Sequence, residues 1–409
     1  MKLFNKNFSL VVLGQIVSLF AASILRFALS TYILDITGRP DLFALVFAVS
    51  AVPGVLLSPL GGAIADRFNR RNLMVIFDFA SSTVALSAAL LFAQGLLSVS
   101  VVGIIMTLLA MISFIYQPAV QASIPVLQTE GNLEKANGIV MGVGALSGLS
   151  GPIVGGLLYG LVGLKVLIEI SCLAFFLSAV MEIFIEIPFE KKSISQSMAV
   201  LIFKDIKDGF YYVTKRKPEI FKIMTLAALL NLFLVPFFII GLPYIYRITL
   251  GLTDRLYGLS LGVIELSTIV GALTVGLVTK RMQLNTLYKW IFVISTFFAP
   301  LALAFVPQVL DRVFLVPFLI LNLFAIPIAI MVTQLSIFVI TAIQKETPND
   351  LLGKVMATIT AVSQSAAPLG QLLYGGLFAA LKGAIYVPLL IIGVIVFLIG
   401  LVGKTFKLN

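Results

Sequence analysis

Long apolar stretches separated by short polar segments occupy almost the whole chain. A helix needs about 20 mostly apolar residues to cross the hydrocarbon core of a bilayer. The pattern therefore predicts an all-α integral membrane protein with an even number of spans, so that both ends of the chain lie on one side. We predict twelve transmembrane helices, at residues 8–35, 42–65, 72–94, 97–118, 137–159, 161–187, 220–246, 256–278, 285–307, 313–340, 354–380 and 384–403.

The segment 188–219 interrupts this pattern after the sixth predicted span. It is the most densely charged part of the chain, and apolar residues such as Ile202 and Ile206 recur near helical spacing with Lys and Asp on the other face. This arrangement predicts an amphipathic helix that lies along the cytoplasmic membrane surface. We therefore expect a six-helix bundle over 1–187, an amphipathic linker over 188–219 and a second six-helix bundle over 220–409.

Two short motifs recur between the predicted halves. The string Leu-Leu-Tyr-Gly at 157–160 returns at 372–375, and the motif that begins at Gly62 returns in part at Gly276, at nearly the same shift. Small-residue motifs also recur by chance in membrane proteins, so that explanation stays open. A true repeat of six helices predicts two pseudo-symmetric bundles with a solute site between them near the middle of the membrane.

The composition agrees with a membrane protein, and the charges set its orientation. The chain is 60% hydrophobic and 11% charged, against roughly 25% charged residues in a typical soluble domain. Of its 28 Lys and Arg residues, 21 fall on the side of the termini, six on the other side, and Arg26 falls within the first span. Positive residues collect in cytoplasmic loops, so we expect both termini in the cytoplasm. The net charge of +10 thus reflects topology and does not predict a nucleic-acid partner.

A charged loop joins the second and third predicted spans. Five of its residues carry a pattern: Gly62, Asp66, Arg67, Arg70 and Arg71. Their spacing resembles the loop between helices two and three of major facilitator superfamily transporters, although Asn69 stands where many members have Gly. The resemblance implies the two-bundle major facilitator fold and a loop that stabilises one end state of the transport cycle. We expect Asp78, in the third span, to join this gating network at the cytoplasmic surface.

The fifth span carries a second motif, made of Gly148, Gly151, Pro152, Gly155 and Gly156. Gly residues at intervals of four share one helix face, which lets a neighbouring helix approach closely, and a proline bends the helix. The string resembles the helix-five motif of major facilitator exporters that work as antiporters. The segment 117–125 resembles the macrolide-efflux-type branch of drug:proton antiporters. The resemblance implies efflux of amphipathic small molecules, such as macrolide-like antibiotics and other drugs, driven by protons.

Ionisable residues inside apolar spans are costly and mark candidate sites. Glu265, near the middle of the eighth span, is the candidate proton carrier and is otherwise a buried, hydrogen-bonded carboxyl group. Arg26 is a candidate for binding an anionic group or tuning a carboxylate; otherwise it forms a structural ion pair or extends toward the outer membrane surface. Asn231 and Gln117 are candidate substrate contacts or simple helix-to-helix contacts. Glu182 and Glu186, four residues apart, are expected to pair with cytoplasmic Lys or Arg.

Other features limit the possible functions. The chain has no His, a single cysteine, Cys172, and no phosphate-binding Gly-x-x-x-x-Gly-Lys-Ser/Thr motif. We therefore expect no cofactor, no metal site and no enzymatic activity, and a monomer in a bacterial-type plasma membrane. The fourth span, 97–118, has no charged residue, whereas many proton-coupled drug exporters have an Arg there. An uncoupled facilitator, or a lipid or siderophore exporter of the same fold, remains the alternative.

Overall fold

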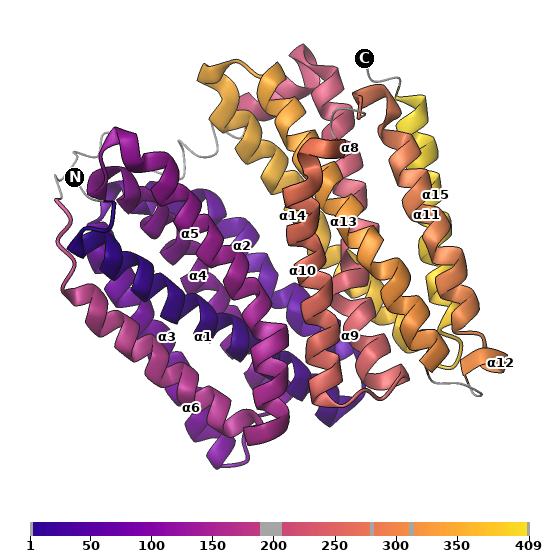
Figure 1. Cartoon of the computed structure of the whole chain (residues 1–409), viewed down its shortest axis with the longest axis horizontal. Helices are drawn as coiled ribbons and strands as arrows, with labels where there is room; N and C mark the ends of the chain where they lie inside the picture. The colour runs from indigo at the N-terminus through magenta and orange to yellow at the C-terminus, as the bar shows by residue number, and fades with distance from the viewer. Residues whose placement is uncertain (1–2, 189–206, 279–281, 311–314, 407–409) are drawn as a thin grey trace. The chain divides into compact units, whose positions relative to one another are not determined.

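Helices make up nearly all of the computed structural model, which describes residues 3–188, 207–278, 282–310 and 315–406. No β-strand occurs in these described ranges. Within them, nine helices are long and apolar enough to cross a membrane, which confirms the all-α membrane class; the count of twelve stays a prediction. The chain separates into two compact units (Figure 1): Met1–Ile36, Val49–Ile202 and Thr253–Gly262 form the first, and Thr37–Ala48, Phe203–Leu252 and Val263–Asn409 form the second.

The predicted division at 188–219 is not tested by this clustering, because two short segments cross over. The start of the second span, Thr37–Ala48, belongs with the C-terminal helices, and Thr253–Gly262 belongs with the N-terminal ones. Residues 189–206 of the predicted amphipathic linker lie outside the described part of the chain. Its end is described: residues 207–211 are α-helical and a π-helical turn follows at Tyr212–Arg216.

The first unit is built mainly from the N-terminal helices. They are α1 (Lys6–Thr37), most of α2 (Pro40–Arg67), α3 (Arg70–Ala93), α4 (Val99–Leu127), α5 (Glu130–Ser150), the π-helical turn η1 (Gly151–Gly155) and α6 (Gly156–Ile183). Helix α3 packs on α6 and on α4. Helix α3 begins at a clear cap, since the Asn69 side chain accepts hydrogen bonds from the backbone N–H groups of Arg71 and Asn72. Asn is among the best N-cap residues, so Asn69 has a structural role although it departs from the loop pattern.

The apolar stretch from Ala136 to Ile183 contains a sharp break. Gly163 has φ 75° and ψ 175°, which is not helical and is a conformation that only glycine adopts readily. The break falls close to the predicted boundary between the spans 137–159 and 161–187. A single residue therefore interrupts the long helical stretch near the predicted boundary, and the division into two spans stays a prediction.

The second unit contains the C-terminal helices. They are α8 (Pro218–Phe233), η3 (Phe237–Gly241), α9 (Leu242–Tyr244), η4 (Ile245–Thr249), most of α10 (Asp254–Val278), η6 (Leu284–Thr286), α11 (Leu287–Ala304), α12 (Pro307–Leu310), α13 (Leu315–Glu346), α14 (Asn349–Ala380) and α15 (Tyr386–Thr405). The seventh predicted span is irregular between α8 and η4, where Pro236 and Pro243 each remove a backbone donor.

Aromatic residues of this irregular span form the core of the second unit. Phe237 packs edge-on against Phe298 with ring centroids 5.2 Å apart, and Tyr244 packs against Phe378 at 5.5 Å. Phe237, Tyr244 and Tyr246 are buried. These three side chains therefore neither face lipid nor line an open pocket in this unit.

An ion pair joins two helices at one end of the second unit. Lys217, just before α8, donates to Glu346 at the end of α13 across 2.8 Å. The hydrogen bond and the charge of Glu346 raise the pKa of the Lys217 ammonium above its ordinary value. Both side chains are exposed, so this pair adds little to stability and mainly fixes the two helix ends.

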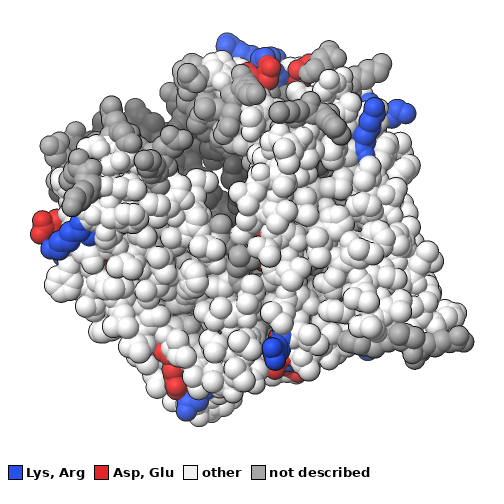
Figure 2. All heavy atoms as spheres, viewed as in Figure 1, with Lys and Arg blue, Asp and Glu red and all other residues white. Residues whose placement is uncertain are grey.

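The outer surfaces of the helices are apolar. Leu273 and Leu277 of α10 are 81% and 75% exposed, and charged side chains on the face shown in Figure 2 gather near helix ends with uncharged residues between them. Such a surface is stable against lipid but not against water. The chain is therefore a multi-pass membrane protein by surface chemistry as well as by helix length.

Changing Gly163 to Ala tests whether this single residue sets the break. We expect Gly163→Ala to lower the free energy of unfolding by about 1–3 kcal/mol, because a side chain is strained at this φ and ψ even though the surrounding space is open. Gly138→Ala, in an open helical position of α5, is the matched control and should be neutral or stabilising. Thermal unfolding in detergent measures both, and equal effects would contradict the assignment.

Candidate functional site

The charged loop motif lies where α2 ends and α3 begins. Gly62, Asp66 and Arg67 belong to the last turns of α2, and their side chains lie outside the described part of the structure. The Arg70 Nε donates to the Ala65 carbonyl across 3.3 Å. Arg71 donates through Nε, at 3.1 Å, and through Nη2 to the carbonyl of Ile183 at the end of α6. The gating role predicted for this motif stays a prediction.

Arg71 has a position that the sequence motif did not indicate. It connects the first turn of α3 to the last residue of α6, which is distant in sequence. The last carbonyls of a helix have no partner within the helix and carry partial negative charge. A guanidinium on the Ile183 carbonyl therefore caps α6 and holds it to the charged loop.

The helix-five motif makes close backbone contacts within the first unit. A Cβ on Gly151 would lie 2.6 Å from the Ser23 Oγ of α1, and one on Gly156 would lie 2.6 Å from the Cα of Gly258 in α10. Gly155 faces α1 at Ile24. These three glycines therefore let α1 and the start of α10 approach the η1 turn, as small residues do in membrane helices.

Other members of the motif do different things. Gly148 is exposed, and a Cβ there would meet no atom within 4 Å. Pro152 occupies the start of the π-helical turn, where a missing N–H is tolerated. The sequence motif thus combines a tightly packed half, from Gly151 to Gly156, with an open half that begins at Gly148.

The two candidate charged residues of the spans are exposed. The side chains of Arg26 in α1 and Glu265 in α10 form neither a hydrogen bond nor an ion pair with any described residue. Among the described residues, therefore, neither the ion pair of a structural Arg26 nor the hydrogen bond of a structural Glu265 is present, and the alternative that Arg26 extends toward the outer membrane surface stays open. Their roles in binding remain predictions.

The candidate polar residues are less exposed. Asn231 donates to the Ala227 carbonyl across 2.9 Å and borders an internal cavity of about 70 Å³ lined mainly by aliphatic side chains of α8, α11 and α13. This volume suits a few small groups and not a drug-sized ligand. Gln117 of α4 is half-buried. The roles of both residues as substrate contacts stay predictions.

A buried cluster of polar residues lies within the first unit, and the sequence did not indicate it. Glu182 of α6 is fully buried and accepts a hydrogen bond from the Tyr116 hydroxyl of α4 at 2.7 Å. Asp78 of α3 is 1% exposed and accepts one from the Ser18 hydroxyl of α1 at 2.7 Å. Four helices thus place hydroxyl and carboxyl groups in one apolar interior.

This cluster corrects the expectation for Glu182. Glu182 does not pair with Lys or Arg among the described residues, and it does not share a helix face with Glu186, because α6 ends at Ile183. Asp78 accepts a hydrogen bond from Ser18, and its expected place in the gating network of the loop stays a prediction, because the side chains of Asp66 and Arg67 lie outside the described part of the structure. No spacing rule along the chain could have found a site whose members come from separate helices.

Comparison with known proteins identifies the family. The Major Facilitator Superfamily profile matches residues 11–371. The chain belongs to the Major Facilitator Superfamily. Its family and fold are therefore those of membrane transporters and not of enzymes.

Relatives with curated sequences are distant. Macrolide efflux protein A of Streptococcus pyogenes is 24% identical over 204 residues, which are 50% of each chain. An uncharacterized MFS-type transporter of Bacillus subtilis, YfiS, is 25% identical over 169 residues, 41% of this chain and 39% of that one. The chain thus spans half or less of the length of the curated relatives that it matches.

Solved structures share the fold over the whole chain. A D-xylose–proton symporter has a TM-score of 0.73 at 12% identity and covers 98% of this chain and 97% of its own. A bacterial homologue of the iron transporter ferroportin, in an inward-facing state, also has a TM-score of 0.73, at 15% identity with 98% of each chain covered. At these identities the likeness establishes the major facilitator fold alone.

The tight half of the helix-five motif should resist added volume. We expect Gly156→Ala to lower the free energy of unfolding by about 1–3 kcal/mol, because the new Cβ meets the backbone of Gly258, which cannot rotate away. Gly148→Ala places the same methyl group in open space and is the matched control. Thermal unfolding midpoints in detergent distinguish the two, and a neutral Gly156→Ala would contradict the close packing.

Proposed function

We propose that this major facilitator transporter exports amphipathic small molecules, such as macrolide-like antibiotics and other drugs, in exchange for protons. The observation that carries the proposal is the tightly packed stretch from Gly151 to Gly156, whose sequence resembles the helix-five motif of antiporters and whose glycines pack closely on α1 and α10. The distant similarity to macrolide efflux protein A over half of the chain supports the same substrate class.

Export would proceed by alternating access. Two bundles, residues 1–187 and 220–409, would expose a shared site first to one side of the membrane and then to the other. The loop that contains Asp66 and Arg67 would stabilise one of these end states through charge contacts that break on switching. Both termini would lie in the cytoplasm, and the monomer would be the working unit.

The exposure of Arg26 and Glu265 supports a role in the transport pathway. A charged side chain at membrane depth that faces lipid costs several kcal/mol, and neither residue has an ion-pair partner among the residues described. A water-filled cavity removes this cost. Glu265 would then carry a proton or contact a cationic substrate, and Arg26 would contact an anionic group or influence a carboxylate, with Gln117 and Asn231 as further polar contacts.

The alternative is an uncoupled facilitator, or an exporter of a lipid or siderophore. Predicted span 97–118 has no charged residue, where many proton-coupled drug exporters have an Arg. This absence in the sequence favours the uncoupled mechanism. Transport into vesicles with and without a proton gradient separates it from the leading proposal.

Reconstituted vesicles with an imposed pH gradient test the coupling. We expect the gradient to drive accumulation of a macrolide or a hydrophobic dye, and an uncoupler to abolish it. Accumulation that continues unchanged when the uncoupler is added would favour the uncoupled facilitator mechanism. Vesicles that contain no protein are the control for passive partition of the hydrophobic compounds.

The loop variant Asp66→Asn tests the gating role. We expect it to reduce transport at least tenfold while the protein still folds, since the carboxylate would be lost from contacts that hold one end state and not from the core. Thermal unfolding and transport are measured on the same preparation. Normal export by a stably folded Asp66→Asn protein would count against the role.

The variant Glu265→Gln tests the proton carrier. The amide keeps the size of the side chain but cannot exchange a proton, so we expect gradient-driven accumulation to fall while substrate-for-substrate exchange continues. Glu186→Gln, which neutralises an exposed carboxylate beyond the end of α6 at Ile183, is the control. Full gradient-driven export by Glu265→Gln would exclude Glu265 as the carrier.

A further inference from the structure

Asp78 and Glu182 form a buried pair of carboxyl groups within the first unit. Asp78 is 1% exposed and Glu182 is 0% exposed. A short series of contacts links them: Ser18 donates to Asp78, Gly14 lies one turn before Ser18, and a Cβ on Gly14 would be 2.9 Å from the Glu182 Oε1. The two groups therefore share one interior.

The groups around the pair are neutral. Helix α1 contributes Gln15 and Ser18, α4 contributes Tyr116, and α6 contributes Ser178, whose hydroxyl donates to the Gly14 carbonyl across 3.0 Å. The guanidinium nearest in sequence to the cluster, that of Arg71, binds the Ile183 carbonyl. Neither carboxyl has a Lys or Arg within ion-pair distance in the described ranges.

The unsatisfied atoms in this region are all acceptors. Asp78 Oδ2, Glu182 Oε2 and Gln15 Oε1 are buried and have no hydrogen-bond partner among the described residues. Two ionised carboxylates without a counter-ion in an apolar interior are strongly unfavourable. Protonation of a carboxyl group removes its charge and turns one of its oxygen atoms from an acceptor into an O–H donor. That donor can then form a hydrogen bond to a neighbouring acceptor.

We propose that Asp78 and Glu182, together with Tyr116 and Ser18, form a proton-binding site of this transporter. The pair holds at least one proton when the first unit is closed as in this structure. Two carboxyl groups in one interior cannot both ionise at low cost, so they share protons, as interacting acids do. The site differs from Glu265, whose side chain is exposed.

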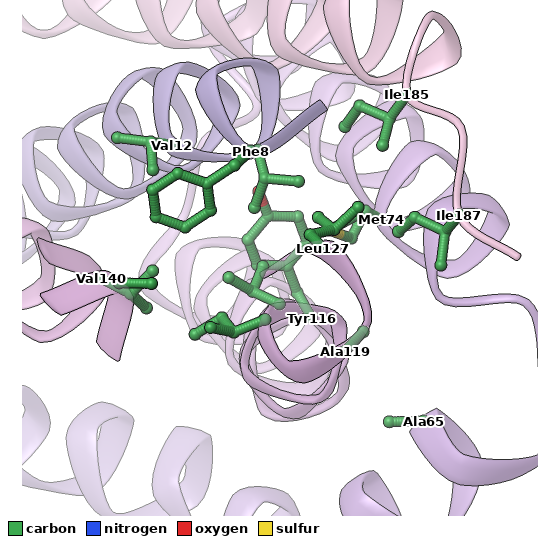
Figure 3. Close-up of a cluster of buried hydrophobic side chains, with 14 of the residues drawn as sticks. Phe8, Val12, Ala65, Met74, Tyr116, Ala119, Leu127, Val140, Ile185 and Ile187 are labelled. Atoms are coloured by element: carbon green, nitrogen blue, oxygen red, sulfur yellow. The ribbon is translucent and has the colours of Figure 1, made fainter. Parts of the chain in front are cut away.

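An apolar cluster separates the pair from one end of the unit. Phe8, Val12, Met74, Leu127 and Ile185 belong to this cluster, which surrounds Tyr116 (Figure 3). The cluster residues of α1 come before Ser18 in the sequence, and those of α3 come before Asp78. Those that follow α6 come after Glu182. The cluster therefore lies at the end of the unit where α1 and α3 begin and α6 ends.

A hollow lies at this same end of the first unit. It has a volume of about 890 Å³ and is lined by Lys6, Arg71 and Glu186, and also by Leu127 and Ile185 of the apolar cluster. The cluster thus stands between a polar hollow and the carboxyl pair. Proton release requires that these apolar side chains part, which makes exchange depend on the conformation of the unit.

Infrared difference spectroscopy tests proton binding directly. A protonated carboxyl group has a C=O stretching band that an ionised carboxylate lacks. We expect this band at neutral pH in the wild type and in Glu186→Gln, the matched control four residues after Glu182. It should be lost in Asp78→Asn/Glu182→Gln, and it should shift in Tyr116→Phe, which removes the hydroxyl donor.

Two results would overturn the site. One is a wild-type spectrum at neutral pH that shows no band dependent on Asp78 or Glu182. The other is a band that disappears when sodium chloride replaces a salt of a large organic cation, because a sodium ion would then occupy the same oxygens. A band that does not change with the sodium concentration supports a proton bound to the carboxyl pair.

Thermal unfolding supplies a second readout that does not depend on transport. If the folded pair binds more protons than the unfolded chain, the stability of the wild type falls as the pH rises. Asp78→Asn/Glu182→Gln imitates the protonated pair, so it should fold and lose much of this pH dependence. A variant with the same pH dependence as the wild type would contradict the proposal.

The use of this proton in transport rests on the proposed function, and vesicle assays separate the two. We expect Asp78→Asn/Glu182→Gln to lose at least tenfold in gradient-driven export while it keeps substrate-for-substrate exchange. Gradient-driven export by the variant at the wild-type level would overturn coupling through the pair but leave proton-driven export intact. If export by the wild type does not depend on the pH gradient but the infrared band is present, the proposed function is overturned. The proton-binding site is then still supported.

Discussion

The lipid bilayer imposes the constraint on which this structure depends, because it offers no hydrogen-bond partner to the backbone and no solvation to charge. Helices satisfy their own backbone groups, so the described chain is helical nearly throughout. The same constraint makes each charge inside a span informative. Glu265 is exposed within an apolar helix, whereas Asp78 and Glu182 are buried among hydroxyl groups. The same constraint thus meets two different environments, an open one around Glu265 and a buried one with hydroxyl partners around Asp78 and Glu182.

Much of the fold could be predicted from the sequence, because span length and apolar content are properties of consecutive residues. The family also followed from one loop, since the spacing of Gly62, Asp66 and Arg71 is local. Asn69 departs from that pattern, and its role as the cap of α3 became clear only from the hydrogen bonds to Arg71 and Asn72. The number of spans and the division into two bundles are still predictions, because parts of the chain lie outside the described ranges and short segments group with the opposite unit.

The candidate site was harder to predict, because its members come from separate helices. The hydrogen bond between Tyr116 and Glu182 joins residues 66 positions apart, and no periodicity encodes such a pair. The four-residue spacing of Glu182 and Glu186 was misleading, because the helix ends between them at Ile183. Nearly uniform hydrophobicity also hides which helix faces point inward, and therefore the aromatic residues around Phe237 could have been assigned to lipid, pocket or core. Packing against Phe298 places that ring in the core.

The hydrogen bonds that Arg71 donates to the Ile183 carbonyl have a mechanical consequence. Ile183 follows Glu182 directly, so the arginine that begins α3 pulls on the peptide beside a buried carboxyl. A shift of the charged loop is therefore transmitted to Glu182 through the Arg71 side chain and the peptide unit that joins Glu182 to Ile183. The charged loop and the buried carboxyl pair are thus connected through the hydrogen bonds of a single side chain.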